Sequence, residues 1–295
     1  MDPWLTAKVE AAIARATGKS AKIARGEDVA GGSIGEARRL RLADGRRFFL
    51  KSLAAERLPG IFAAEAAGLA ALADAGVLRV PRVLAQEEDF LLLELIELHP
   101  PAAGFFENFG HGLARLHREA RTDLFGFAED NYLGRSRQPN GWSRSWTTFW
   151  RDHRLGYQLT LPNAQDDHEL QVLGEKLLDR LPQWLNEVQE SPSLLHGDLW
   201  AGNYLCGAGS QPVLIDPVVY YGHREAELAM ARLFGGFPPA FYAAYEEEWP
   251  LPPGEEERGA IYQLYHLLNH YNLFGPSYRS GCLEILRKLT SRKGG

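Results

Sequence analysis

The chain has 295 residues, of which 45% are hydrophobic and 24% charged, the mixture of an ordinary folded globular protein. Its formal net charge of −6 provides no general attraction to nucleic acid or an anionic membrane, and we expect neither as a partner. The two cysteines are too few for a disulfide framework or a zinc site. Without a signal-like start or an apolar run of spanning length, we expect a cytoplasmic protein.

The first third of the chain has the texture of a small sheet with an inserted helix. Strand-like runs are punctuated by glycine, and the turn Ala43-Asp44-Gly45 is typical of a β-hairpin. We predict helices over 3–16 and 59–76, and strands over 22–28, 33–42, 46–53, 82–86 and 90–96. Residues 1–96 are therefore expected to form an N-terminal lobe.

The remainder, 97–295, has mainly helical periodicity. We predict helices over 102–119, 145–160, 166–180, 224–233, 238–248, 256–274 and 280–290, interrupted by two short strands at 203–206 and 212–216. The predicted fold class is α+β, with a small antiparallel sheet lobe and a larger, mainly helical lobe.

A group of polar residues with informative spacing lies near residue 200. Residues 196–199 read His-Gly-Asp-Leu, Asn203 follows Asp198 by five positions, and Asp216 follows an apolar, strand-like run. The protein-kinase catalytic loop, H-R-D-L-x-x-x-N, has this spacing and is also followed by a metal-binding Asp. Asp198 is thus a candidate catalytic base for an acceptor hydroxyl. Asn203 and Asp216 offer the oxygen ligands that Mg²⁺ prefers.

A simpler explanation is a turn in which Asp198 caps backbone amides. It would account for the His-Gly-Asp triplet, but not for Asn203 and Asp216 at matching positions. Gly197 stands where protein kinases have an arginine that responds to activation-loop phosphorylation. In this respect the chain resembles the aminoglycoside and choline kinases, which implies a constitutive small-molecule kinase with a protein-kinase-like fold.

Such a kinase needs a lysine on a strand of the N-terminal lobe and a glutamate on the next helix. Lys51 ends a strand-like run, and Glu65 lies in an otherwise apolar helical segment, with Glu56 as a weaker rival. Lys51 could alternatively be a solvated residue at the end of a strand. The pair would place the phosphates of ATP, which we expect as the phosphoryl donor.

Two further segments are candidates for nucleotide contacts. Gly31, Gly32 and Ser33 lie where a turn covering the phosphates should be, although a plain hairpin turn would also explain them. The run 91–96 ends the N-terminal lobe, and the backbone groups near Glu94, Leu95 and Ile96 are expected to read the adenine edge. Residues 1–96 are accordingly predicted to be the nucleotide-binding lobe and 97–295 the catalytic and acceptor-binding lobe.

Across most of its length the sequence resembles the fructosamine kinase, or ketosamine 3-kinase, family. The family's Trp after Asp-Leu is present as Trp200, and the block Tyr-Tyr-Gly-His-Arg-Glu at 220–225 is far more specific than the generic kinase pattern. Further matching segments are 32–34, 130–134, 138–142, 215–217, 226–230, 233–237, 262–264, 269–270 and 274–275.

The resemblance implies ATP- and Mg²⁺-dependent phosphorylation of the ketose 3-hydroxyl in fructosamines, ribulosamines or related ketosamines, leading to deglycation. The partner would be a small sugar–amine adduct or a glycated lysine. Asp198 carries over as the base, Asn203 and Asp216 as metal ligands, and Lys51 as the phosphate-binding lysine.

Three acceptor-side residues are less certain from sequence. Trp200 could stack on the sugar or be a packing residue, while His223 and His270 could contact the substrate or be satisfied core groups. A kinase of an aminoglycoside, choline or homoserine, or a catalytically silent kinase-like binding module, remains an alternative. The sequence leaves the preferred sugar and the oligomeric state open.

Overall fold

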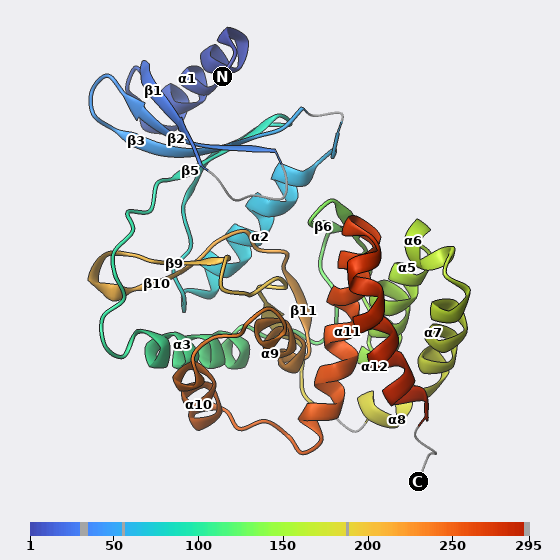
Figure 1. Ribbon diagram of the computed structural model, residues 1–295. Helices are drawn as coiled ribbons and strands as arrows, with labels where there is room; N and C mark the ends of the chain where they lie inside the picture. Colours follow the sequence, from blue (N-terminus) through green and yellow to red (C-terminus); the bar gives the residue numbers. More distant parts are fainter. Residues whose placement is uncertain (30–34, 55–56, 187–188, 292–295) are drawn as a thin grey trace. The chain divides into compact units, whose positions relative to one another are not determined.

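The protein is described here from a computed structural model, which describes residues 1–29, 35–54, 57–186 and 189–291. The chain forms two compact units (Figure 1). The first contains Met1–Ala103 and Leu205–Asp216, and the second contains Gly104–Tyr204 and Pro217–Gly295. The segment Leu205–Asp216 thus packs with residues far from it in the sequence. The predicted division into 1–96 and 97–295 has a single boundary and does not include this return of the chain to the first unit.

The first unit is built on a five-stranded antiparallel sheet with the strand order β1-β2-β3-β5-β4. Its strands are β1 (Ile23–Asp28), β2 (Glu36–Leu42), β3 (Arg47–Ser52), β4 (Val83–Gln86) and β5 (Phe90–Glu94). Each lies within a predicted strand, trimmed by one to three residues. The predicted antiparallel sheet is confirmed.

Helix α1 (Pro3–Thr17) covers one face of this sheet (Figure 1). Asp2 caps its start by accepting a hydrogen bond from Leu5 N, and Gly18 ends it in a left-handed conformation. Leu5, Val9 and Ile13 of the helix form a core with the sheet residues Leu40, Leu42, Phe48, Leu50, Phe90 and Leu92. Because side chains alternate along a strand, Lys51 in β3 points to the opposite face from Leu50.

Two other elements complete the first unit. Helix α2 (Ile61–Ala75) packs against β4 and β5 and carries Glu65. The strands β9 (Tyr204–Cys206) and β10 (Pro212–Leu214) form a two-stranded ribbon, joined by the short 3₁₀ turn Ala208–Ser210. The ribbon is attached to the segment between α2 and β4, where Arg79 O accepts a hydrogen bond from Leu214 N at 2.8 Å. This attachment brings Asp216, two residues after β10, into the first unit.

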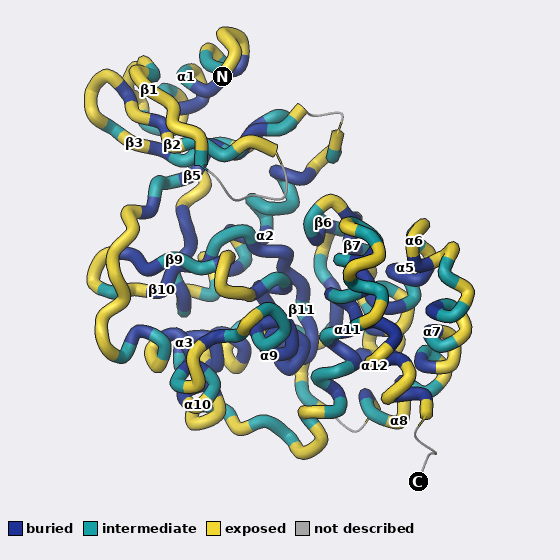
Figure 2. The backbone as a smooth tube through the Cα atoms, in the orientation of Figure 1, coloured by how far each residue is buried: buried dark blue, intermediate teal, exposed yellow. Residues whose placement is uncertain are grey.

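The second unit is mainly helical, as predicted. Helix α3 packs against α10, α9 against α11, and α12 against both α7 and α11. The principal helices are α3 (Phe105–Glu119), α7 (His168–Arg180), α9 (Arg224–Leu233), α10 (Pro239–Glu248), α11 (Glu255–Phe274) and α12 (Arg279–Ser291). Figure 2 shows that α9 is enclosed, and its residues Arg224–Ala231 are all buried. None of the helices in the described ranges is long and apolar enough to cross a membrane.

The predicted helix over 145–160 has an interruption. Helix α4 (Trp146–Trp150) runs into a π-turn at Arg151–Leu155 and continues as α5 (Gly156–Leu159). Gly156 N donates to Arg151 O across this turn, five residues back. A Cβ on Gly156 would lie 2.5 Å from that same oxygen, so glycine is required at the widened turn.

Several small elements of the second unit were not predicted. They are the helices α6 (Pro162–Gln165) and α8 (Pro182–Leu185), the ribbon of β6 (Asn131–Leu133) with β7 (Ser136–Gln138), and the ribbon of β8 (Ser193–Leu195) with β11 (Tyr220–Gly222). Strands of three residues are too short to show a period of two in the sequence. The β8–β11 ribbon matters for function because residue 196, the start of the kinase-like loop, follows β8 directly.

Candidate active site

In the first unit, one lysine binds two carboxylates that lie far apart in the sequence. Lys51 Nζ lies 2.6 Å from Glu65 Oε1 on α2 and 2.7 Å from Asp216 Oδ1 after β10. The structure thus brings together three of the residues singled out from the sequence. The rival glutamate, Glu56, lies outside the described residues.

The charges of this cluster depend on one another. Burial alone would lower the pKa of Lys51, but the carboxylates of Glu65 and Asp216 more than offset it and raise that pKa, so the lysine stays a cation. Burial also raises the pKa of Glu65, against the opposing effect of Lys51. The lysine therefore holds a positive charge between the two carboxylates.

Asp216 has an unusual backbone conformation. Its φ of 56° is in the left-handed region, which a residue other than glycine adopts at a cost of about 1–3 kcal/mol. Aspartate is among the few residues that tolerate this region, and such outliers concentrate at functional sites. The conformation is a structural reason to regard Asp216 as more than an ordinary ion-pair partner.

The predicted adenine-reading segment follows β5. The carboxylate of Glu94 accepts a hydrogen bond from Arg79 Nη2 at 2.6 Å and a longer one from Arg82 N at 3.3 Å. Pairing of β5 with β3 stops at Glu94, so the backbone groups of Leu95 and Ile96 lie beyond the sheet ladder. The phosphate-turn candidates Gly31, Gly32 and Ser33 lie outside the described residues.

In the second unit, the kinase-like loop brings Asp198 and Asn203 together. Asn203 Nδ2 donates to the Asp198 backbone oxygen at 2.8 Å and to Asp198 Oδ2 at 3.0 Å. Since the amide nitrogen faces Asp198, the side-chain oxygen of Asn203 is directed away from it. That arrangement positions the carboxylate of Asp198 and presents an amide oxygen beside it.

Gly197 is required by the geometry of this loop. Its φ is 85°, and a Cβ there would lie 2.0 Å from Val218 O. The two segments are also joined by a hydrogen bond from Val218 N to His196 O, at 2.8 Å. The glycine that replaces the arginine of protein kinases therefore has a direct steric cause. The sequence pattern alone did not reveal this cause.

Trp200, two residues after Asp198, retains an accessible surface. Its side chain is 39% exposed, and its ring lies over the backbone of Gly202, where a Cβ would come within 2.4 Å of ring carbons. The flat contact with glycine fixes the ring without enclosing it. A partly exposed indole two residues after Asp198 is compatible with the stacking role considered from sequence.

The structure buries the side chain of His223 in the second unit. This side chain is only 1% exposed, stacks on Trp146 with ring centroids 4.7 Å apart, and lies 3.2 Å from the hydroxyl of Tyr262 through Nδ1. Burial lowers the pKa of His223 to about 3, so it is neutral. The side chain is thus a core group, although its Nε2 has no hydrogen-bond partner among the described residues.

His270 differs because it is only partly buried. Its Nδ1 donates to His266 O at 2.8 Å, which leaves Nε2 as a hydrogen-bond acceptor. The rings of Phe234, Phe274 and Tyr278 surround it, with centroids 4.7, 5.5 and 5.0 Å from the imidazole. Burial lowers the pKa of His270, so a neutral imidazole is presented in an aromatic setting.

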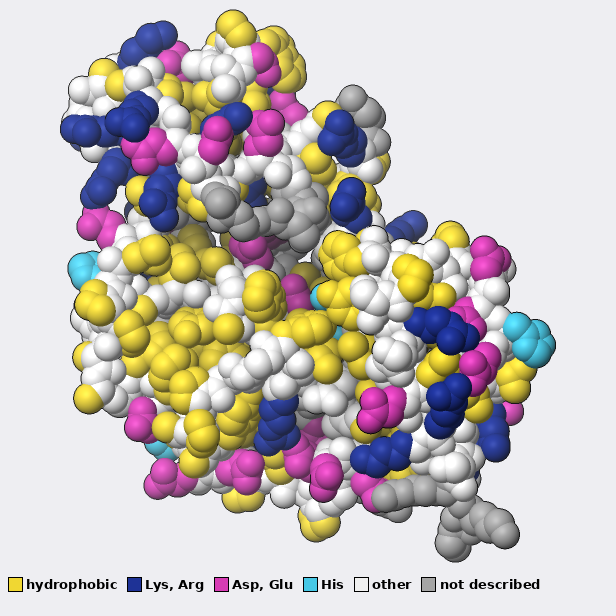
Figure 3. Space-filling view, in the orientation of Figure 1, with side chains coloured by type: hydrophobic (Ala, Val, Ile, Leu, Met, Phe, Trp, Pro, Cys, Tyr) yellow, Lys and Arg dark blue, Asp and Glu magenta, His cyan; other side chains and the backbone are white. Residues whose placement is uncertain are grey.

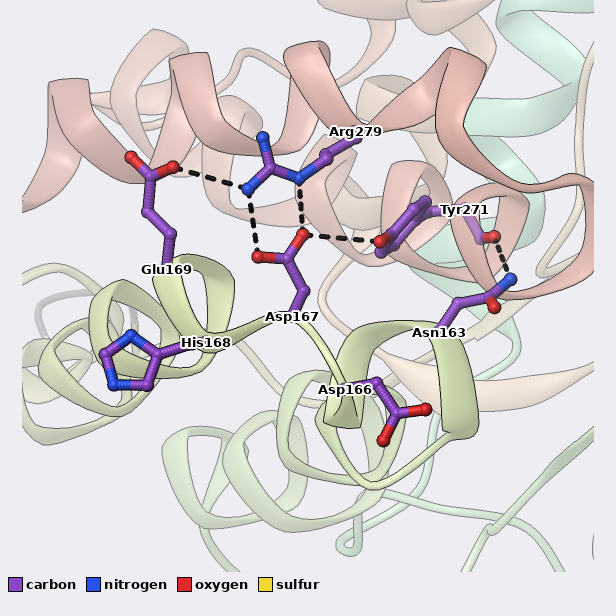
Figure 4. Close-up of a pocket in the computed structure, with 7 residues that line it drawn as sticks. All are labelled: Asn163, Asp166, Asp167, His168, Glu169, Tyr271 and Arg279. Atoms are coloured by element: carbon purple, nitrogen blue, oxygen red, sulfur yellow. Dashed lines mark hydrogen bonds and ion pairs between the residues drawn. The ribbon is translucent and has the colours of Figure 1, made fainter.

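A cavity of about 560 Å³ elsewhere in the second unit is not part of this site (Figure 4). Its lining residues are Asn163, Asp166, Asp167, His168, Glu169, Tyr271 and Arg279, and none is a predicted site residue. Arg279 pairs with Asp167 at 2.5 Å and with Glu169 at 3.3 Å. Figure 3 shows acidic and basic side chains adjacent to one another on this surface over α7 and α12. Its charged groups thus largely satisfy each other.

The antiparallel sheet with its lysine–glutamate pair and the Asp198–Asn203 loop define a protein-kinase-like phosphotransferase. A family model described as fructosamine kinase matches residues 5–292. A probable ketoamine kinase of Synechocystis sp. is 37% identical over 291 residues, covering 97% of this chain and 96% of that protein. A chloroplastic protein-ribulosamine 3-kinase of Oryza sativa subsp. japonica is 38% identical over 91% of this chain and 80% of its own.

The solved structure named "Putative fructosamine-3-kinase" from Haemophilus somnus superposes with a TM-score of 0.87 at 29% identity, covering 97% of each chain. The chain therefore belongs to the fructosamine kinase family. It is an ATP-dependent phosphotransferase, and the kinase-like α+β fold predicted from its sequence is confirmed.

Proposed function

We propose that the protein phosphorylates the ketose 3-hydroxyl of ketosamines, such as fructosamines and ribulosamines, and so initiates their deglycation. The observation that carries this proposal is the Asp198–Asn203 loop in a chain that matches ketoamine and ribulosamine kinases along nearly its whole length. The substrate would be a small sugar–amine adduct or a glycated lysine.

Asp198 is the proposed catalytic base. The acceptor hydroxyl oxygen forms a bond to the γ-phosphorus of ATP, and the bond from that phosphorus to the β,γ-bridging oxygen breaks. ADP leaves with the electron pair of that bond, and Asp198 takes up the hydroxyl proton. The hydrogen bond from Asn203 Nδ2 at 3.0 Å supports this role, because it fixes the carboxylate in one orientation.

Lys51, held by Glu65, is the proposed ligand of the ATP phosphates. Glu94, Leu95 and Ile96 remain the proposed adenine-reading segment, and Gly31, Gly32 and Ser33 the proposed phosphate-covering turn. The donor set of Asn203 and Asp216, an amide and a carboxylate oxygen, fits Mg²⁺, which would neutralise charge on the phosphates when bound. The lysine pair at 2.6 Å supports the assignment on the nucleotide side.

On the acceptor side, we propose Trp200 and His270 as substrate contacts. The exposed face of Trp200 suits the apolar face of a sugar, and Nε2 of His270 can accept a hydrogen bond from a sugar hydroxyl or an ammonium group. We also propose a cytoplasmic location, since both cysteines, Cys206 and Cys282, are free and buried, as is usual in a reducing compartment.

The test is an ADP-release assay with magnesium-ATP and a panel of acceptors: N-α-protected fructosyl-lysine, ribulosyl-lysine, free fructose, choline and kanamycin. We expect turnover on a ketosamine, and a fall of about 10²-fold or more in kcat for Asp198→Asn. Turnover on choline or kanamycin alone would support kinase activity but refute ketosamines as the substrate class. Loss of turnover in Asp198→Asn must occur with ATP still bound, which isothermal calorimetry checks.

A further inference from the structure

The five-stranded sheet of the first unit has two faces of different character. Helix α1 covers one face, on which Leu40 and Leu50 belong to the core. Side chains alternate along a strand, so the intervening residues of β2 and β3 lie on the other face. These residues are Ala37, Arg39, Arg41, Arg47, Phe49 and Lys51. This second face, called the Lys51 face below, therefore also carries three arginines.

Arginines lie directly opposite one another across three strands of this face. Arg41 of β2 is opposite Arg25 of β1 on one side and Arg47 of β3 on the other. Residues in such positions of an antiparallel pair have neighbouring side chains, and like charges there destabilise the sheet. One step along β2, Arg39 adds a further positive charge opposite Phe49. The fold gains no stability from this row, which points to another use for its charge.

Two of these arginines are not neutralised. The side chains of Arg39 and Arg41 are exposed and form no ion pair or hydrogen bond with any residue in the described ranges. By contrast, Arg25 pairs with Glu27 at 3.1 Å and Arg47 pairs with Glu97. Figure 3 shows Lys and Arg side chains gathered over β1, β2 and β3. The Lys51 face thus has two uncompensated positive charges beyond Lys51 itself.

A nucleotide approaching Lys51 needs such an attraction, because ATP with its Mg²⁺ is an anion. Acidic and basic residues are equal in number over 1–103, and the protein as a whole has a net charge of −6. At Lys51, one ammonium group lies between the carboxylates of Glu65 and Asp216, which leaves a negative balance. Both the molecule and this cluster therefore repel an anion. The unpaired arginines of the same face supply an opposing attraction.

The spacing of the two arginines suits an action over a distance. Ala37 is the residue of β2 opposite Lys51, and Arg39 and Arg41 follow it by two and four positions. At about 3.4 Å per residue, they lie about 7 and 14 Å along the strand from that row. The Debye length at physiological ionic strength is about 8 Å, so the field of these charges extends toward Lys51 without contact.

We propose that Arg39 and Arg41 steer ATP electrostatically onto the Lys51 face of the sheet. Charges of one sign beside a binding site raise association rate constants by about 10–10³-fold, and the effect falls steeply with ionic strength. Steering speeds the encounter and leaves the lifetime of the complex nearly unchanged. The proposal rests on the function proposed above only in placing the phosphates of ATP at Lys51, and it is independent of the sugar acceptor.

The test measures nucleotide association by stopped-flow fluorescence. Methylanthraniloyl-ATP with Mg²⁺ is mixed with wild-type protein and with the double variant Arg39→Gln/Arg41→Gln, without any acceptor. At about 20 mM salt we expect the association rate constant to fall about threefold to tenfold, with the dissociation rate constant changed less than about twofold. At about 0.5 M salt, where the Debye length is about 4 Å, the two proteins should associate at nearly equal rates.

A matched control removes the same net charge from elsewhere in the first unit. Arg15→Gln/Lys19→Gln changes two exposed residues at the end of α1, the helix on the opposite face, and breaks only an exposed pair of Arg15 with Glu87 at 2.9 Å. Association should stay within about twofold of wild type. Equal slowing in both double variants would overturn the proposal, because total charge and not position would then govern the rate.

The charge is separated from the shape of the side chains by a third double variant. Arg39→Lys/Arg41→Lys retains both charges, and we expect it to associate at nearly the wild-type rate. If it were as slow as the glutamine variant, or if the glutamine variant stayed slow at about 0.5 M salt, the arginines would act by direct contact and steering would be refuted. A wild-type rate in the glutamine variant at low salt would refute it as well.

Lys51→Met tests the placement of the phosphates separately. We expect its dissociation rate constant to rise at low and at high salt, because a contact in the complex is lost. An unchanged dissociation rate would overturn the placement of ATP at Lys51 and this proposal with it. A raised dissociation rate, together with arginine variants whose rates do not depend on salt as described, would overturn the steering proposal alone.

Discussion

The Lys51 cluster and the loop that contains Asp198 show two ways of holding a carboxylate of the candidate site. Asp216 is held by another side chain, Lys51 Nζ at 2.7 Å, which also binds Glu65. Asp198 belongs to a loop whose backbone is fixed by Glu227, which is fully buried. The first arrangement can exchange partners when a ligand brings new charge, since a lysine side chain is flexible. The second cannot, because backbone amides have no alternative position.

The largest effect on activity is expected from removing the charge of Lys51, which pairs with Glu65 and Asp216. Lys51→Met should lower kcat/KM for ATP by about 10²–10³-fold. Removing a single hydrogen-bond donor that stabilises the charge of a transition state typically lowers the rate by this factor. Initial rates at varied ATP measure it. The matched control is Lys8→Met, which breaks another lysine–aspartate pair of the same unit, with Asp89 at 2.6 Å. Comparable losses in the two variants would contradict a specific role of Lys51.

The next largest effect is expected from a substitution in the loop that contains Asp198. Gly197→Ala combines a φ of 85° with a Cβ that would lie 2.0 Å from Val218 O, so we expect a loss of about 3 kcal/mol in unfolding free energy together with lower kcat. Gly18→Ala also has a positive φ, of 66°, but meets nothing within 4 Å. It should cost only about 1 kcal/mol.

Chemical denaturation and steady-state rates measure both glycine variants. If Gly197→Ala cost no more than Gly18→Ala, the close approach of Val218 to the loop would not be a feature of the protein. An active Gly197→Ala protein of reduced stability would indicate that the loop tolerates movement, which would weaken the contrast drawn with Lys51.

The smallest effect concerns the core that supports the loop rather than the loop itself. Burial lowers the pKa of both His223 and His266 to about 3, below the value of 6.5 expected in the unfolded chain. The folded state is therefore favoured fully above pH 6.5, and its advantage declines as the pH falls, because the unfolded chain takes up protons first. Each histidine contributes about 1.4 kcal/mol per pH unit below 6.5.

His223→Phe should reduce that slope while keeping the stack on Trp146. The variant starts less stable at neutral pH because it loses the contact with the Tyr262 hydroxyl. His168→Gln changes an exposed histidine and should retain the wild-type slope. Unfolding free energies from pH 4.5 to 7.5 decide the matter, and a wild-type slope in His223→Phe would mean that this histidine is not buried in solution.

The sequence predicted the residues whose spacing is local. Asp198 and Asn203 lie five positions apart, and Glu65 follows Lys51 by fourteen across one helix start, so a pattern can find both pairs. His223 was ambiguous because the Trp146 that encloses it lies 77 positions earlier, and no local signal reports such a contact. Burial could be decided only by the fold.

The contact of Glu227 with the loop that contains Asp198 was not predicted, for the same physical reason. It lies 31 residues from the amide of His196 that it binds, on a helix whose charged residues look like an exposed face. A clue was available: Arg224, Glu225 and Glu227 lie within four positions on a helix that is buried almost throughout. Charges on a buried helix require partners, but the sequence does not say which.

The π-turn at Arg151–Leu155 gives the helical segment 146–159 a change of phase. Each residue of an α-helix advances the direction of the side chains by about 100°, and a π-turn accommodates one residue more than the α-helix needs. The side chains before and after the turn thus point in directions that differ from those of one continuous α-helix. Deleting a single residue there, such as Asp152, would restore a continuous α-helix. It would also rotate Arg154, now buried against Tyr220, relative to Trp146 and Phe149.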